Sequence, residues 1–157
     1  MSTYDRVAQL PLEVESLELE GLELAVTSDF TRISTLVKLR GGGEVGIGED
    51  VTYDGLDQIA LQDAGRSLDL AGSYTLDSFS RRLEEAELWP APPVREVSRL
   101  YRRWAFESAA LDLGLRQAGR SLAEAARKLT ANPRRVLCRQ HGGDALDAAD
   151  RAHGRLG

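Results

Sequence analysis

The 157-residue sequence contains one cysteine and two histidines, and it has no long run of apolar residues. Cys138 alone cannot form an internal disulfide framework, which is typical of proteins in the reducing cytoplasm. With only His141 and His153 in the chain, a zinc site of the His/Cys type and a thiolate–imidazole pair are both disfavoured. No stretch approaches the roughly 20 apolar residues that cross a bilayer, and no signal peptide opens the chain. We therefore expect a cytoplasmic protein without membrane contact.

The composition is that of a globular protein, but its charge is distributed unevenly. Residues 1–90 carry a net charge of −11 and residues 91–157 a net charge of +6, which together give −5. The clustered arginines of the basic half are Arg95, Arg99, Arg102 and Arg103. Such a cluster can bind nucleic acid, yet an acidic half and a basic half in one small chain more often neutralise each other. We therefore expect no nucleic-acid binding.

Alternating apolar residues predict three short strands within the first 53 residues. The apolar residues of the first run, residues 17–26, switch faces midway, which predicts a β-bulge near Gly21. The second and third runs alternate over residues 33–39 and 45–47. Tight connections, the sequences SDFT and GGGE, make the three strands an antiparallel meander.

Helical spacing replaces this alternation from about residue 55 onward. A short helix is expected near residues 56–60, and Thr75 is expected to cap the next one. The strongest signal is a stripe that steps by three and four over residues 94–118 and stops at Gly119. A capping box in the sequence SLAE begins the last helix. With strands first and helices after, the predicted class is α+β, a three-stranded antiparallel meander followed by a helical bundle.

Aromatic and leucine side chains at helical spacing in the longest predicted helix indicate core packing. These residues are Trp104, Phe106, Leu111 and Leu115. Two acidic residues, Glu107 and Asp112, lie in the same mainly apolar helix. Each is expected to pair with an arginine at i,i+4 spacing, Glu107 with Arg103 and Asp112 with Arg116.

The sequence GGGEVG at residues 41–46 contains the G-x-G-x-x-G spacing of a dinucleotide-binding loop. Such a loop must open a helix whose N-terminus meets the pyrophosphate. Here the glycines lead into the alternating residues Val45 and Ile47, and then into two carboxylates that would repel a phosphate. We therefore expect a hairpin turn rather than a nucleotide site.

Two stretches, in this order, resemble the N-terminal capping domain of the enolase superfamily, in the branch of mandelate racemase and muconate lactonizing enzyme. They are TRISTLVKLRGGGEVGIGEDVTYD at residues 31–54 and RRWAFESAALDLGLRQAGRSLAEA at residues 102–125. The resemblance spans roughly residues 12–129, and we expect the capping domain to occupy residues 1–130. It implies a three-stranded antiparallel sheet followed by a helical bundle, in agreement with the strand and helix patterns.

In that family the capping domain covers the mouth of a modified (β/α)-barrel, which carries the Mg²⁺-binding carboxylates and a lysine or histidine base. The resemblance therefore implies a Mg²⁺-dependent isomerase or lyase, with the barrel domain as partner. Two loops of the cap close over the substrate and set its specificity. Carried onto this sequence, the substrate-binding residues of these loops are Asp29, Phe30, Thr31, Glu49, Asp50 and Tyr53.

Local structural roles compete with substrate binding at these positions. Asp29 can accept backbone hydrogen bonds in an Asx-turn, and Phe30 can cover the sheet edge. Glu49 and Asp50 are neighbours in a strand and so point to opposite sides, which disfavours a catalytic pair. One of the two is expected to cap the following turn. Tyr53 can simply pack at the end of its strand.

The catalytic part of the family is not recognisable after residue 130. The last lysine is Lys128 and the barrel carboxylates are absent, so we predict no catalytic residue, metal ligand or cofactor within this chain. Residues 131–157 are expected to form a mostly disordered tail, in which RRVLC is a remnant of the first barrel strand. The leading hypothesis is a truncated or split cap that is not catalytic alone. The alternative is a non-enzymatic interaction module whose bare barrel-facing surface binds a partner or forms a homo-oligomer.

Overall fold

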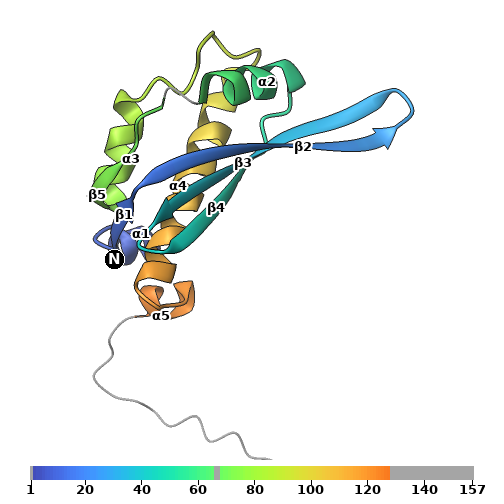
Figure 1. Ribbon diagram of the computed structural model, residues 1–157. Coiled ribbons are helices and arrows are strands. Elements are labelled where there is room, and N and C mark those ends of the chain that lie inside the picture. Colours follow the sequence, from blue (N-terminus) through green and yellow to red (C-terminus); the bar gives the residue numbers. More distant parts are fainter. Residues whose placement is uncertain (1, 66–67, 128–157) are drawn as a thin grey trace, which may run out of the picture. The chain divides into compact units, whose positions relative to one another are not determined.

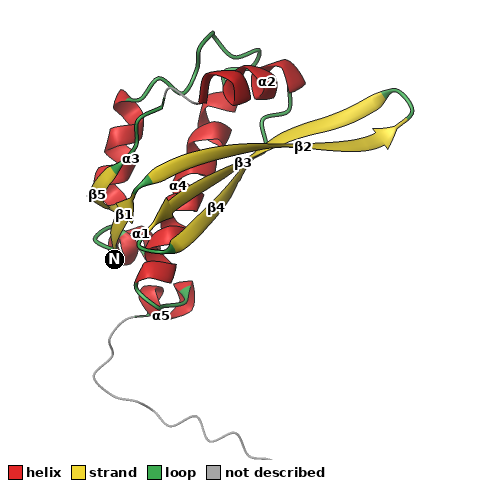
Figure 2. Ribbon diagram, in the orientation of Figure 1, coloured by secondary structure: helices red, strands yellow, loops and turns green. Residues whose placement is uncertain are grey.

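Strands dominate the first part of the chain and helices the second, so the fold is α+β as expected (Figure 1 and Figure 2). The computed structural model describes residues 2–65 and 68–127, and the predictions for residues 131–157 lie outside this described part. The elements are α1 (Thr3–Val7), β1 (Pro11–Val14), β2 (Ser16–Thr27), β3 (Phe30–Gly41), β4 (Glu44–Asp50), α2 (Gly55–Ala64), β5 (Gly72–Thr75), α3 (Leu76–Glu85), α4 (Ser98–Gln117) and α5 (Leu122–Ala126). Within the described residues, no helix combines the length and the apolar character needed to cross a membrane.

The expected meander is confirmed as a three-stranded antiparallel sheet with the order β2-β3-β4. The turn between β3 and β4 is made by Gly42 and Gly43, whose φ angles are 56° and 79°. A two-residue hairpin turn with both φ angles positive suits glycine, because a side chain would strain this backbone. The glycine-rich stretch is therefore a hairpin, as its sequence context predicts.

The remaining glycines of this stretch let helix α4 approach the sheet closely. A Cβ atom built on Gly46 would lie 2.2 Å from the carbonyl oxygen of Ala109, and one on Gly48 would lie 2.0 Å from that of Ala105. Both distances are far below ordinary contact, so β4 and α4 can pack this tightly only without those side chains. The glycine spacing thus encodes helix–sheet packing in addition to the turn.

The β2–β3 hairpin extends beyond the helices as a two-stranded arm (Figure 1). The predicted bulge near Gly21 is wrong, because pairing is regular there and the register shifts only between Ala25 and Thr27. The apolar side chains of β2 switch from one face of the strand to the other because only the first part of the strand packs against the core. Leu17 and Leu19 pack against the core. In the arm, where β4 no longer pairs, the apolar side chains of β2 are exposed, with Leu24 at 65%.

A second, two-stranded sheet pairs β1 with β5 and was not predicted from the sequence. Pro11 lies opposite Thr75 and Val14 opposite Gly72, with the strands antiparallel. Leu12 and Val14 are buried, and their neighbours in the strand are exposed. Four residues give only two apolar positions, which is too short a run for alternation to stand out.

Helix α4 buries a different side from the one its apolar stripe predicts. It begins at Ser98, so the predicted start at residue 94 is too early. Phe106 and Leu115 are buried and Leu111 is half-buried, but Trp104 is 54% exposed, and its assignment to the core is wrong. The side that meets the sheet carries small residues and an arginine instead. Its buried positions are Ser98, Arg102, Ala105, Phe106, Ala109, Ala110, Leu113, Gly114 and Leu115.

Local capping signals identified the helix ends correctly. Thr75 caps α3 in a reciprocal capping box with Ser78, and Ser121 caps α5 in one with Glu124. Gly119, with φ of 60°, follows the last turn of α4, as expected for a helix terminated by glycine.

The predicted ion pairs within α4 are confirmed. Arg103 Nε lies 2.9 Å from Glu107 Oε1, and Arg116 Nε lies 3.0 Å from Asp112 Oδ1. These pairs satisfy the acidic side chains of a largely apolar helix.

Candidate functional site

The two predicted substrate loops meet at one end of the sheet. The turn between β2 and β3 and the connection from β4 to α2 are joined by stacking of Phe30 on Tyr53, with ring centroids 6.1 Å apart and an interplanar angle of 19°. Arg32 Nη2 donates a hydrogen bond of 2.8 Å to the carbonyl oxygen of Val51. We call this region, residues 28–32 and 49–54, the loop junction.

Two guanidinium groups flank the ring of Tyr53 at the loop junction. The Cζ atoms of Arg32 and Arg95 lie 5.6 Å and 5.0 Å from the ring centroid, within the range of cation–π attraction. Arg95 also forms an ion pair with Asp54, with 3.2 Å between Nε and Oδ2. Tyr53 remains 52% exposed. The junction therefore presents an aromatic surface beside two positive charges, and neither arginine was among the predicted site residues.

All of the predicted site residues except Asp50 are exposed at the surface, Phe30 and Tyr53 included. Asp29, Thr31 and Glu49 all belong to the exposed class. In the turn, the backbone N–H of Asp29 donates to Thr27 Oγ1 at 3.3 Å, so the side chain of Thr27 supplies the acceptor that was expected of Asp29. Glu49 and Asp50 point to opposite sides of β4, as expected for neighbours in a strand.

Asp50 is fully buried and serves the fold. Its Oδ1 atom accepts hydrogen bonds from the backbone N–H of Thr52 at 2.9 Å and from the Thr52 hydroxyl at 2.6 Å. Its Oδ2 atom accepts one from Arg102 Nε at 2.9 Å. The expected capping of the turn after β4 is therefore made by Asp50.

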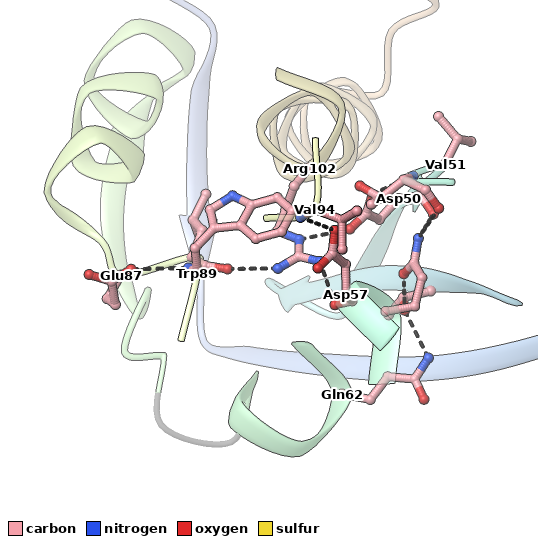
Figure 3. A network of polar contacts seen from close by, with 12 residues as sticks. Asp50, Val51, Asp57, Gln62, Glu87, Trp89, Val94 and Arg102 are labelled. Atoms are coloured by element: carbon pink, nitrogen blue, oxygen red, sulfur yellow. Dashed lines mark hydrogen bonds and ion pairs between the residues drawn. The ribbon is translucent and has the colours of Figure 1, made fainter. Parts of the chain in front are cut away.

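Arg102 is the centre of the polar network behind the loop junction, shown in Figure 3. Besides Asp50, its guanidinium binds the carbonyl oxygens of Leu88, at 3.0 Å from Nη1, and Asp57, at 2.7 Å from Nη2. The Trp89 ring covers it, with Cζ 3.5 Å from the ring centroid. Burial lowers the pKa of Arg102, and the hydrogen bond and charge of Asp50 oppose that shift. Sequence reasoning missed this residue because it lies in a run of otherwise exposed or half-buried arginines.

Gln58 ties the connection after β4 to helix α2. Its Nε2 donates to the carbonyl oxygens of Asp50 at 2.8 Å and Thr52 at 2.9 Å, while its Oε1 accepts from Thr35 Oγ1 at 2.7 Å. Gln62 Nε2 donates to the same Thr35 hydroxyl at 2.9 Å (Figure 3). These bonds fix the backbone that carries Tyr53, so the exposed ring is presented from a rigid base.

Apolar side chains around the loop junction are exposed to an unusual degree. They are Val51 at 45%, Leu56 at 77%, Ile59 at 44% and Val94 at 64%. Val94 is held near α2 by a hydrogen bond of 3.2 Å from its backbone N–H to Asp57 Oδ2. Grouped apolar exposure of this kind usually marks a surface that contacts another molecule. Together with the loop junction, we call these four residues the junction surface.

The arginine cluster of the basic half is paired with carboxylates. Arg95 binds Asp54, Arg99 binds Glu96 and Arg102 binds Asp50; Arg103 binds Glu84 and Glu107. Three of these arginines thus reach carboxylates of the acidic half. The charges neutralise each other as the sequence suggested, and the absence of nucleic-acid binding stays a prediction.

A metal site requires several ligating side chains close together. Among residues 2–65 and 68–127, no group of three or more His, Cys, Asp or Glu side chains is arranged to hold a metal ion. The carboxylate of Asp50, which is the buried acid nearest the junction, already binds Thr52 and Arg102. The described residues therefore do not fit a Mg²⁺ site.

Comparison with protein families places most of the chain in a described family. Residues 5–125 match the family model described as "Domain of unknown function (DUF8230) N-terminal domain". No curated protein and no solved structure matches the chain. The matched residues include nearly all of the described fold, from α1 to α5. The chain therefore belongs to the DUF8230 family and carries its N-terminal domain.

Proposed function

We propose that this domain is a capping domain of the enolase superfamily type, which encloses the substrate of a Mg²⁺-dependent lyase or isomerase. The observation that carries the proposal is the convergence of two loops far apart in sequence. Phe30, from the β2–β3 turn, stacks on Tyr53, from the connection after β4, and both are partly exposed. In a complete protein these loops would lie over the mouth of a barrel and select the substrate.

The exposed apolar side chains around the loops support the presence of a further domain on that side of the molecule. Leu56 and Val94 are more than half exposed, although each would gain free energy from burial, at about 25 cal/mol per Å² of apolar surface. The family description names an N-terminal domain, which supports a further domain in family members. A barrel packed on the junction surface would cover these side chains.

In the proposed protein, the two domains supply different parts of the active site. Because the described residues do not fit a metal site, the Mg²⁺ ligands and the base would come from the barrel. This chain would contribute the exposed residues of the loop junction, among them Asp29, Phe30, Glu49 and Tyr53, as walls that exclude water and contact the substrate. Asp50 would act through the fold, since Arg102 and Thr52 occupy its carboxylate.

The test begins with the coding sequence after residue 157 and elsewhere in the source genome. We expect a (β/α)-barrel with a lysine or histidine base and spaced Asp or Glu residues. Co-expressed with this chain, it should exchange the α-proton of carboxylate substrates with D₂O in the presence of Mg²⁺, as followed by NMR. Tyr53→Ala should lower kcat/KM by about tenfold or more for some substrates only. Leu24→Ala, in the hairpin arm, is the control and should leave kcat/KM unchanged. The absence of any such barrel would refute the proposal.

A second candidate function is a non-enzymatic interaction module, favoured by the same exposed side chains. In that case the junction surface binds a protein partner or forms a stable homo-oligomer of fixed size. Size-exclusion chromatography of the 157-residue chain over a wide concentration range separates the two proposals. A barrel-dependent cap should associate as concentration rises, because its apolar surface is bare. A self-standing module should elute at one volume at all concentrations.

A further inference from the structure

A pocket of about 340 Å³ is lined by residues of α1, α3, α4 and the start of α5. Its lining includes Tyr4, Leu76, Trp104, Glu107, Leu111 and Leu122. None of the lining residues belongs to the junction surface. Sites for small molecules usually have volumes of about 300–1,000 Å³, so this pocket suits one ring with a short chain.

Exposed aromatic and apolar side chains form the walls of the pocket. Trp104 is 54% exposed, Tyr4 48% and Leu122 45%, although all three are residues that gain from burial. Tyr101 contacts Trp104 with ring centroids 5.7 Å apart and holds the indole on the flank of α4. These walls can cover the apolar body of a ligand, and an aromatic face also attracts a cation.

Glu107 supplies a carboxylate to this mainly apolar lining, which also includes Thr3, Ser80 and Ser108. Its Oε1 atom accepts hydrogen bonds from Ser80 Oγ at 2.5 Å and from Arg103 Nε at 2.9 Å. Within the described part of the chain, no hydrogen bond reaches its Oε2 atom. A carboxylate can accept about four hydrogen bonds, so Glu107 retains the capacity to bind a donor from a ligand.

The charges around the pocket favour a cation. Arg103 is shared between Glu107 and Glu84, whose Oε1 lies 3.0 Å from Arg103 Nη2. Asp77 binds Arg81 and accepts a hydrogen bond of 2.9 Å from the Tyr4 hydroxyl. Three carboxylates in this network therefore meet two guanidinium groups.

The titration of Tyr4 is consistent with that negative balance. Burial raises its pKa, and the hydrogen bond to Asp77 and the charges of Asp77 and Glu107 raise it further, with Arg81 opposing. The same field that disfavours a phenolate favours a positively charged ligand.

We propose that this pocket binds a small organic amine, with its apolar body against Trp104 and Tyr4 and its ammonium group donating to Glu107. The inference does not depend on the proposed capping function, because the two sites share no residue. A second copy of the chain is the competing occupant, and it is distinguished by the experiment below.

The test measures binding of three ligands of matched shape to the full chain, by titration calorimetry and tryptophan fluorescence. The probes are 2-phenylethylamine, the neutral 2-phenylethanol and the anionic 3-phenylpropanoate. A charge-assisted hydrogen bond should make the amine bind on the order of tenfold more tightly than the alcohol. The carboxylate should bind most weakly of the three.

Two charge-removing variants separate the pocket from its surroundings. Glu107→Gln should abolish the preference for the amine while leaving the alcohol unchanged. Glu84→Gln removes a charge from the same Arg103, but Glu84 does not line the pocket. It is the matched control and should keep the preference within about twofold, because its carboxylate is 59% exposed and screened. Trp104→Leu should weaken the amine and the alcohol alike, and circular dichroism verifies folding of every variant.

Three results would overturn the proposal. Equal binding of the three probes, or binding of none, would show that the pocket does not select an amine. If Glu84→Gln lost the preference for the amine as fully as Glu107→Gln does, the preference would come from the overall negative charge around the pocket and not from a contact with Glu107. Sedimentation showing a dimer that Trp104→Leu dissociates would make a second copy the occupant.

Discussion

The residue on which the loop junction most depends is Arg102. Its guanidinium is fully buried. Nε donates to Asp50, Nη1 to the carbonyl oxygen of Leu88 and Nη2 to the carbonyl oxygen of Asp57. A buried charge is tolerated only when it is paired and hydrogen-bonded, because desolvation costs several kcal/mol per ion. One side chain on α4 thereby fixes the end of β4, the start of α2 and the segment that follows α3.

Replacing Arg102 should therefore strongly destabilise the fold. We expect Arg102→Met to lower the free energy of unfolding by about 3–5 kcal/mol, because it leaves the carboxylate of Asp50 buried without its cation. Adding Asp50→Asn should recover part of this loss. The control is Arg99→Met, which breaks the exposed pair with Glu96 and a cation–π contact with Trp89 at 5.9 Å, and should cost about 1 kcal/mol or less. Urea unfolding followed by circular dichroism measures all of them, and equal losses for Arg102→Met and Arg99→Met would contradict the assigned role.

At the scale of elements, α4 packs very closely on β4. Gly46 and Gly48 face the backbone of α4, where Ala105 and Ala109 present short side chains. Because backbone atoms cannot move aside as a flexible side chain can, these positions tolerate no Cβ. The contact explains why the small residues of α4 are buried while Trp104 is not.

Gly48→Ala should push α4 away from the sheet. The new Cβ would lie 2.0 Å from the Ala105 carbonyl oxygen, so we expect a loss of about 1–3 kcal/mol in the free energy of unfolding. Ile47→Val changes the neighbouring position on the exposed face of the same strand and should cost less than about 0.5 kcal/mol. Thermal unfolding compares the two variants. A loss in Gly48→Ala no larger than in Ile47→Val would show that the close packing is not required.

Helix α5 depends on its capping box. The backbone N–H and the hydroxyl of Ser121 both donate to Glu124, and they lower the pKa of that carboxyl. Because the folded-state pKa is depressed, this contribution to stability is present above the unfolded pKa and is lost as pH falls through the folded value.

Removing the hydroxyl should shift this titration. In Ser121→Ala the pKa of Glu124 should rise part of the way to its ordinary value, since the backbone N–H of residue 121 still donates. NMR titration of the Glu124 side chain measures the shift. Ser2→Ala, which removes the equivalent cap of α1, should leave the Glu124 titration unchanged, and a shift of the same size in both variants would contradict the local origin.

The sequence predicted well the features that depend on neighbouring residues in the chain. It missed the features that depend on tertiary packing. Caps and turns at Thr75, Ser121 and Gly119 depend on a few neighbouring residues, so their patterns could be read directly. The buried side of α4 depends on where another element can approach, which periodicity does not reveal. The same limit hid Arg102, because a buried arginine and a surface arginine look identical in a sequence. The loop residues were placed together, as Phe30 and Tyr53 show, but their substrate role stays a prediction.

For the molecule as a whole, the described residues leave apolar surfaces uncovered besides that of the hairpin arm, and two of these share no residue. One is the junction surface, which includes Leu56, and the other is the pocket beside Trp104. The first surrounds the loops, as expected for contact with a domain. The second is a partly open pocket lined by Glu107, as expected for a small ligand. Different variants should therefore affect association and ligand binding independently.

The chain should associate with itself through the junction surface when no other domain covers it. Leu56 is 77% exposed on α2, so Leu56→Asp should not reduce stability by more than about 0.5 kcal/mol, yet it should prevent apolar contact between copies. Sedimentation velocity should show a sedimentation coefficient that rises with concentration for the unchanged chain and stays constant for the variant. Leu122→Asp is the matched control, because Leu122 is an exposed leucine beside the pocket and away from the junction surface. If Leu122→Asp alone prevented association, the copies would meet at the pocket, and the junction surface would lose its assignment as the contact with a partner domain.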